Sequence, residues 1–170
     1  MRILLALSLA LVCPSHAGTC REVVRDGSGR TVRTIDRQVS SDGSVRSVIR
    51  DASGRTIGTS VSHPKSDGGS NTTYRDASGR LIGTASSSVS HTVYRDAGGR
   101  LSGTSSTREN GSRTEFRDAC GRLSGSTTCR GGSSGTGTSV TRNASGRLTA
   151  TSSSTGKCKP GGIAPAGPLK

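Results

Sequence analysis

Apolar residues beyond the first seventeen positions of the chain follow no helical period. They stand instead in short runs on either side of a six-residue motif, Arg-Asp-Ala-Ser-Gly-Arg. The motif occurs unchanged at 50–55 and 75–80, and near copies begin at the arginines 25, 95, 117 and 142. Successive copies start 25, 25, 20, 22 and 25 residues apart. A short period that recurs six times is typical of a repeat architecture, and short apolar runs around a turn motif predict β-hairpins.

Each copy of the motif has the chemistry of a tight turn. Asp76 suits the first position of a type I turn, because its carboxylate can accept a hydrogen bond from the backbone N–H two residues on. Gly79 then supplies the left-handed residue that closes a three-residue hairpin loop with a bulge. The same glycine stands in all six copies: Gly29, Gly54, Gly79, Gly99, Gly121 and Gly146.

This loop predicts the pairing of the two strands that it joins. Asp76 should face Arg80, and Arg75 should face Leu81. Tyr74 should face Ile82 on the same sheet face as the Asp–Arg pair. The equivalent predicted pairs are Val24 with Val32, Ile49 with Ile57, Tyr94 with Ser102, Phe116 with Ser124 and Thr141 with Thr149.

These hairpins predict an all-β fold made of six short tandem repeats of 20–25 residues. Two arrangements fit: an antiparallel β-meander of about twelve short strands, or a β-solenoid-like array of stacked coils. The turn residues Asp42 and Gly43 predict a further hairpin at 41–44. The segments 61–70 and 130–137 are predicted to be surface loops, since they are rich in Ser, Gly and Pro.

The two ends of the chain differ in composition from the repeats. Residues 1–17 have a basic start, an apolar stretch and small residues before Gly18, which predicts a secretory signal peptide. Residues 18–158 form the predicted repeat domain, and the Pro/Gly-rich residues 159–170 are predicted to be a disordered tail. The mature chain is therefore expected to be secreted, periplasmic or at the cell surface. The short signal favours a bacterial or phage-encoded origin.

Four cysteines remain after the predicted cleavage: Cys20, Cys120, Cys129 and Cys158. An even number of cysteines in an exported chain favours disulfides over a metal site. Three connectivities are possible, and we prefer Cys120–Cys129 with Cys20–Cys158. The second of these would join the two ends of the repeat array and support a core that is poor in apolar residues.

Residues suited to catalysis are scarce. His63 and His91 are the histidines of the mature chain, and both stand in Ser-rich connectors without a partner acid at a suggestive spacing. The acidic residues are mostly the turn aspartates, and the cysteines lack a Cys-x-x-Cys spacing. We therefore expect no enzymatic activity, no metal and no cofactor.

Positive charge is the strongest chemical signal in the chain, which carries a formal net charge of +13. Two arginines flank each turn, so they are expected to gather at the hairpin ends and bind an anionic partner. Candidate partners are an anionic polysaccharide, lipopolysaccharide or nucleic acid, and Tyr-Arg and Phe-Arg dipeptides could stack on a bound strand. The predicted ligand-binding residues are Arg50, Arg55, Arg75, Arg80, Arg95, Arg100, Arg117 and Arg122.

The sequence thus favours an exported, non-enzymatic protein that binds an anionic polymer or surface at the cell envelope. The alternative is a structural or adhesive surface or fibre module that self-assembles or binds a protein partner and whose charge is incidental. The run from Tyr74 to Leu81 resembles the YD repeats of bacterial RHS proteins over about eight residues per repeat, with Arg75 inserted between the Tyr and the Asp. This resemblance implies neither a shell nor a toxin-encapsulating role here, because RHS shells need far longer chains.

Overall fold

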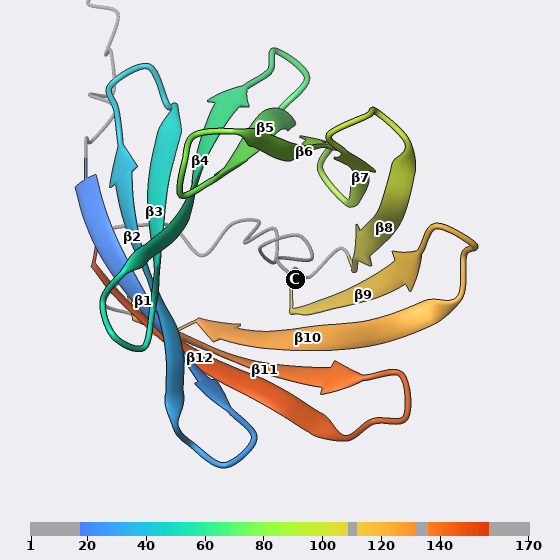
Figure 1. Ribbon diagram of the computed structural model, residues 1–170. Coiled ribbons are helices and arrows are strands. Elements are labelled where there is room, and N and C mark those ends of the chain that lie inside the picture. The colour runs from blue at the N-terminus through green and yellow to red at the C-terminus, as the bar shows by residue number, and fades with distance from the viewer. Residues whose placement is uncertain (1–17, 109–111, 132–135, 157–170) are drawn as a thin grey trace, which may run out of the picture.

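The computed structural model describes residues 18–108, 112–131 and 136–156, and these form twelve antiparallel strands in one closed barrel (Figure 1). Each strand pairs with its neighbours in the chain, and β1 pairs with β12 to close the barrel. No helix in the described ranges is long and apolar enough to cross a membrane. The strands are β1 (Gly18–Asp26), β2 (Thr31–Val39), β3 (Val45–Asp51), β4 (Thr56–Pro64), β5 (Ser70–Asp76), β6 (Leu81–Ser87), β7 (His91–Asp96), β8 (Leu101–Thr107), β9 (Arg113–Asp118), β10 (Leu123–Gly131), β11 (Gly137–Asn143) and β12 (Leu148–Gly156).

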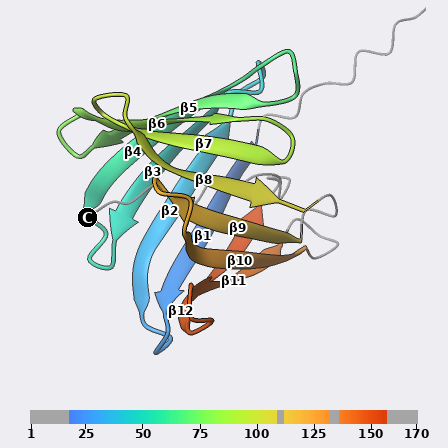
Figure 2. The same ribbon diagram turned by 90° about the vertical axis from the view of Figure 1, so that its right-hand side faces the viewer.

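The six motif turns lie at the same end of the barrel, which we call the turn end. It faces the viewer in Figure 1 and lies on the left in Figure 2. The other end, which we call the connector end, carries the links between successive hairpins. Strands on opposite walls cross in projection in Figure 2 because the strands of a barrel are inclined to its axis. The meander is therefore confirmed in closed form, and the solenoid alternative is wrong: every strand pair is antiparallel and joins consecutive strands or closes the barrel.

The motif forms the turn that the sequence predicts. Asp76 Oδ1 accepts hydrogen bonds from Ser78 N at 2.9 Å, Ser78 Oγ at 2.7 Å and Arg80 N at 2.9 Å. Asp76 N donates to Arg80 O at 3.0 Å, which confirms this pair. Gly79 has a φ of +84°, and the other five motif glycines have φ between +79° and +85°. One side-chain oxygen thus organises each loop by accepting backbone hydrogen bonds, with a serine hydroxyl added in the turns that carry one.

The predicted register of the aromatic and apolar pairs is wrong by one residue. Arg75 faces Leu81 as expected, but Tyr74 faces Gly83, and Ile82 is the extra residue of a β-bulge. The same shift occurs beside every motif turn, because the three-residue loop is followed by a bulge on the returning strand. The extra residues are Val32, Ile57, Ile82, Ser102, Ser124 and Thr149.

A second series of glycines follows these bulges. A Cβ on Gly83 would lie 2.6 Å from Arg95 O, on the first strand of the next hairpin. Gly58, Gly103 and Gly125 have the same kind of contact, with Arg75 O, Arg117 O and Arg142 O at 2.5–2.8 Å. A glycine after the bulge therefore lets neighbouring hairpins approach closely enough to pair.

The barrel interior is apolar on one side and hydroxyl-rich on the other. Val24, Ile35 and Ile49 form one buried cluster, with Ile57 packed against it. Tyr74, Ala85 and Tyr94 form a second, with Ile82 packed against it. Farther round the wall, Ser and Thr pair across strands at 2.8–2.9 Å: Thr107 with Thr114, Thr127 with Thr141, and Ser139 with Ser152. The bulge residues Ile57 and Ile82 thus lie on the predicted face although their partners differ.

The interior also holds a buried ion pair that the sequence did not indicate. Arg37 Nη2 donates to Glu22 Oε2 at 2.7 Å, and their side chains are 16% and 5% exposed. They extend from β2 and β1, next to the seam where β1 meets β12. Their mutual charge compensates part of the cost of burying each group.

The disulfide predictions have different outcomes. Cys120 and Cys129 are free thiols, so the predicted bond between them is not formed. Cys120 lies in a motif turn, and Cys129 is the seventh residue of β10, which begins at Leu123. A strand rises about 3.3 Å per residue, which separates the two cysteines far beyond the reach of a disulfide. Cys158 lies outside the described residues, so Cys20–Cys158 stays a prediction.

Two predicted loops are shorter than expected. In the 61–70 segment, β4 extends to Pro64, and 65–69 forms a tight turn in which Gly68 has a φ of +78°. In the 130–137 segment, β10 continues to Gly131, and β11 begins at Gly137. The predicted turn at 41–44 is confirmed, since Gly43 N donates to Ser40 O at 3.0 Å. The predicted signal peptide, 1–17, and tail, 159–170, lie outside the described residues.

We expect Gly83→Ala to lower the free energy of unfolding by about 1–3 kcal/mol, because the added methyl group overpacks the junction between hairpins. Gly98→Ser is the matched control: it restores the serine that other copies carry at a position where a side chain meets only Asp96 Oδ1 at 3.4 Å. Urea unfolding measures both. Equal stability of the two variants would contradict the close-approach role of Gly83.

Candidate functional site

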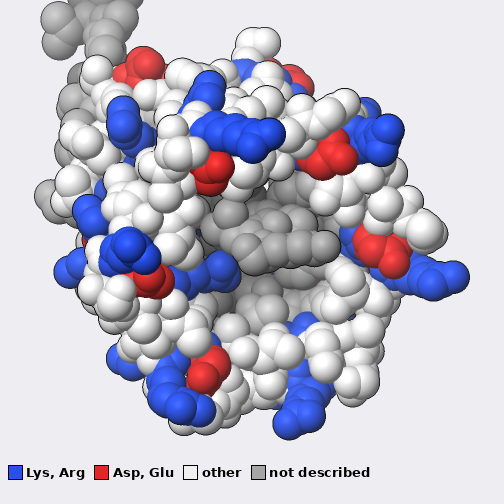
Figure 3. All heavy atoms as spheres, in the orientation of Figure 1, with Lys and Arg blue, Asp and Glu red and all other residues white. Residues whose placement is uncertain are grey.

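Positively charged side chains surround the mouth of the barrel at the turn end. Figure 3 looks onto this end and shows Lys and Arg groups around the mouth of the barrel, with an acidic group beside most of them. The closed fold brings the six motif turns into a ring, so the predicted arginines Arg50, Arg55, Arg75, Arg80, Arg95, Arg100, Arg117 and Arg122 all lie around this mouth. We call the ring of motif turns the rim.

The first arginine braces its own turn in five of the six motifs, and in the first motif Arg25 donates instead to Thr31 Oγ1 at 2.8 Å. Arg75 Nη1 donates to Gly79 O at 2.8 Å. Arg95, Arg117 and Arg142 do the same at 2.9 Å to Gly99, Gly121 and Gly146, and Arg50 reaches Gly54 O at 3.3 Å. These arginines lie on the outer face of the barrel, and part of their hydrogen-bonding capacity is already used.

The second arginine of each motif has a different environment. Arg80 uses its backbone N–H to bind Asp76, but its exposed guanidinium makes no hydrogen bond or ion pair within the described residues. The same holds for Arg55, Arg100 and Arg122. The structure thus separates the eight predicted residues into four whose side chains brace turns and four whose guanidinium groups make no hydrogen bond or ion pair within the described residues.

The first and sixth motifs add two further second arginines to the rim, which our predicted set omits. Arg147 is exposed and follows the sixth turn, where its backbone N–H binds Asn143 Oδ1 at 2.9 Å. Arg30 follows the first turn, and its Nε lies 3.8 Å from Asp26 Oδ2. The motif itself was the signal for both residues.

Three of the turn carboxylates are held in their charged form. Hydrogen bonds from Ser28, Ser53 and Ser78 are the largest cause that lowers the pKa of Asp26, Asp51 and Asp76, with backbone N–H groups and the second arginine adding to the effect. Their negative charge is directed at these donors within the loop. The sixth turn has Asn143 in place of Asp, so it carries positive charge without a carboxylate.

Tyrosine and arginine do not share one binding surface. Tyr74 and Tyr94 point into the barrel and are 8% exposed each, whereas Arg75 and Arg95 are exposed on the outer face. The predicted stacking of Tyr-Arg pairs on a bound strand is therefore wrong, because successive residues of a strand point to opposite faces. Binding at the rim has to depend on charge and hydrogen bonds.

Other chemistry is not assembled in the described part of the chain. His63 is exposed at the end of β4, and His91 is exposed at the start of β7. Within the described ranges, no group of three or more His, Cys, Asp or Glu side chains is placed to hold a metal ion. The rim is therefore the candidate site with the clearest chemistry, a surface of clustered, exposed positive charges.

Comparisons with known proteins add no family. No family model matches the chain, and no curated protein matches it significantly. The fold and the rim define a class by themselves: an up-and-down β-barrel with a basic mouth.

Stability should decrease in acid. The pKa of Asp26, Asp51 and Asp76 is lowered by folding, so their contribution is complete at neutral pH and is lost as the pH falls through the lowered values, below about pH 4. The triple variant D26N/D51N/D76N keeps an acceptor in each turn, as Asn143 does, and removes the titration. The urea midpoints at pH 6 and near pH 3 should differ less in this variant than in the wild-type chain. An equal difference in both chains would show that these carboxylates do not cause the acid sensitivity.

The two arginine classes should differ in their effect on folding. Arg75→Ala removes a hydrogen bond to the turn and should cost about 0.5–1 kcal/mol, whereas Arg80→Ala should cost less than about 0.5 kcal/mol. Both changes remove one positive charge from the same motif. Thermal unfolding of the two variants measures the difference, and identical melting temperatures would show that the Arg75 contact contributes nothing.

Proposed function

We propose that this protein is an exported, non-enzymatic binding protein that holds an anionic polymer or surface at the cell envelope. Its contact surface is the rim, and the free second arginines of the motif are the binding groups. The observation that carries this proposal is that the exposed guanidinium groups of Arg55, Arg80, Arg100 and Arg122 make no hydrogen bond or ion pair within the described residues, at one end of a closed barrel.

Gathering like charges around one mouth costs free energy. Several guanidinium groups around one mouth repel one another, and a ligand with many negative charges relieves this repulsion. Guanidinium groups also match carboxylate and phosphate oxygens in pairs of hydrogen bonds. The neighbouring carboxylates accept bonds from their own loops, which leaves the arginines as the outward-facing charges.

The alternative, a self-assembling structural module, has less support from the fold. A β-sheet usually adds further strands at an exposed edge. Here β1 and β12 pair over seven residues from Cys20–Gly156 to Asp26–Ala150, so the described sheet has no free edge. Assembly would therefore have to use side-chain surfaces.

The test compares two quadruple variants with equal loss of charge. R55S/R80S/R100S/R122S removes the free arginines of the rim, and R46S/R108S/R113S/R130S removes four exposed arginines near the connector end. Fluorescence anisotropy with labelled heparin, alginate oligomers and single-stranded DNA measures binding between 50 and 200 mM NaCl. We expect the rim variant to lower the slope of log affinity against log salt by about 3–4, on the scale of one counterion per lost contact.

The control variant should keep most of the affinity. Equal losses in the two variants would mean that the ligand responds only to net charge, and the rim would not be a site. Full affinity in the rim variant would refute the role of these arginines. Which of the three polymers binds most tightly identifies the class of partner.

A further inference from the structure

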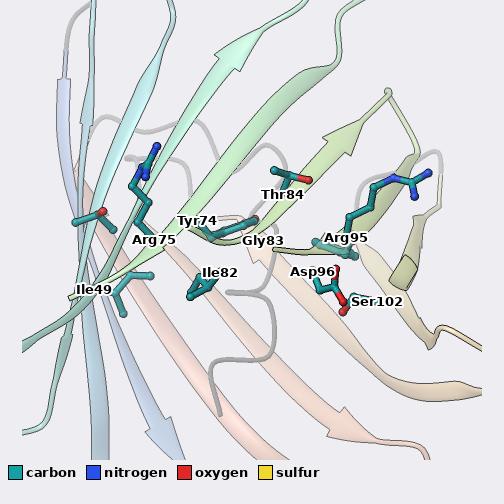
Figure 4. Close-up of a pocket in the computed structure, with 11 residues that line it drawn as sticks. Ile49, Tyr74, Arg75, Ile82, Gly83, Thr84, Arg95, Asp96 and Ser102 are labelled. Carbon is teal, nitrogen blue, oxygen red and sulfur yellow. The ribbon is translucent and has the colours of Figure 1, made fainter. Parts of the chain in front are cut away.

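A small cavity lies inside the barrel wall, between the hairpins β5–β6 and β7–β8. Its volume is about 150 Å³. Ile49, Tyr74, Ile82 and Tyr94 supply its apolar surface, and Ser102 lies at its other side (Figure 4). A cavity of this size accommodates about one benzene ring.

The bulges form part of this cavity. Ile82 and Ser102 are the extra residues of two successive hairpins and occupy equivalent positions. The large residue in one hairpin and the small residue in the next leave room between them. Gly83, which lacks a side chain, also lines this space.

Most charged and polar groups around the cavity have partners elsewhere. Arg75 and Arg95 direct their guanidinium groups away from it and bind Gly79 O and Gly99 O (Figure 4). Asp96 Oδ1 accepts bonds from Gly98 N and Arg100 N at 2.9 Å. The site therefore offers no free cation to a buried anion, and it suits a neutral ligand.

One polar group at the cavity lacks a partner. The Tyr74 side chain is buried, with 8% of the residue exposed, and its hydroxyl has no hydrogen-bond partner among the described residues. Tyr94, by contrast, shares a 3.3 Å hydrogen bond with Ser105 Oγ. An unpaired buried hydroxyl costs free energy, and a ligand oxygen within reach removes that cost.

We propose that this cavity binds a small neutral phenol: one aromatic ring among Ile49, Ile82 and the tyrosines, with its oxygen hydrogen-bonded to the Tyr74 hydroxyl. The ring size follows from the volume, the neutrality from the paired charges, and the oxygen from the unpaired hydroxyl. Arg75 and Arg95 of the rim also line this cavity, but the free second arginines of the motif do not, so binding of a phenol here does not depend on polymer binding.

The test uses 4-fluorophenol and, as a probe of the same shape without an oxygen, fluorobenzene. ¹⁹F NMR follows each probe. Tyrosine ring signals follow the protein, since the chain has two tyrosines and both line the cavity. We expect 4-fluorophenol to bind in the millimolar range or more tightly and to shift both tyrosine signals.

Two variants locate the site. Ser102→Phe fills the cavity and should weaken 4-fluorophenol binding at least about tenfold. Ser124→Phe makes the same change at the equivalent exposed bulge position of β10 and should leave binding unchanged. Equal affinity of these two variants would overturn the proposal.

Tyr74→Phe tests the hydrogen bond and keeps the ring. It should lower the affinity for 4-fluorophenol about fivefold and that for fluorobenzene less than twofold. It should also leave the melting temperature equal or higher, because the lost hydroxyl makes no hydrogen bond within the described part of the chain. Equal weakening of both probes, or no binding of 4-fluorophenol to the wild-type chain, would refute the proposed site.

Discussion

The hydrogen bonds that one side-chain oxygen accepts within each turn determine most of this structure. In the third repeat, Asp76 Oδ1 accepts bonds from Ser78 and Arg80, and the left-handed Gly79 completes the loop. This loop fixes the bulge on the returning strand, and the bulge determines which residues face the interior. The sixth turn shows that an acceptor oxygen is sufficient, because Asn143 Oδ1 accepts the corresponding bonds from Ser145 Oγ and Arg147 N without a charge.

The interior contains few apolar residues, and two kinds of contact stabilise it. Clusters around Ile49 and Tyr74 occupy one side, and cross-strand hydroxyl pairs occupy the other. A barrel of twelve strands is too wide for side chains of this size to meet across its centre. Stability therefore has to come largely from contacts between adjacent strands, with the Glu22–Arg37 ion pair reinforcing the wall beside the seam.

Local chemistry explains which features the sequence predicts and which it does not. The roles of Asp76 and Gly79 follow from a few adjacent residues, so the turns and the hairpins could be predicted. The bulge at Ile82 shifts the strand register by one residue, and the pairing rules for hairpins do not predict this shift. The role of Gly83 depends on a carbonyl of the next hairpin, which local sequence does not reveal. Closure of the barrel pairs Cys20 with Gly156, which lie at opposite ends of the repeat array in the sequence, so local patterns do not predict it. The even number of cysteines suggested a Cys120–Cys129 disulfide, but the length of β10 keeps Cys129 away from Cys120.

The way in which the hairpins join has a consequence for how such a barrel can change in size. Each inner hairpin presents a post-bulge glycine on one side and an arginine carbonyl on the other, so any hairpin of this kind fits beside any other. An in-frame duplication of one repeat adds two strands, preserves the antiparallel closure and lengthens the circumference by roughly 10 Å. The bore of the barrel is therefore set by the number of repeats, and it can widen or narrow in whole steps without any change in the residues that build the wall.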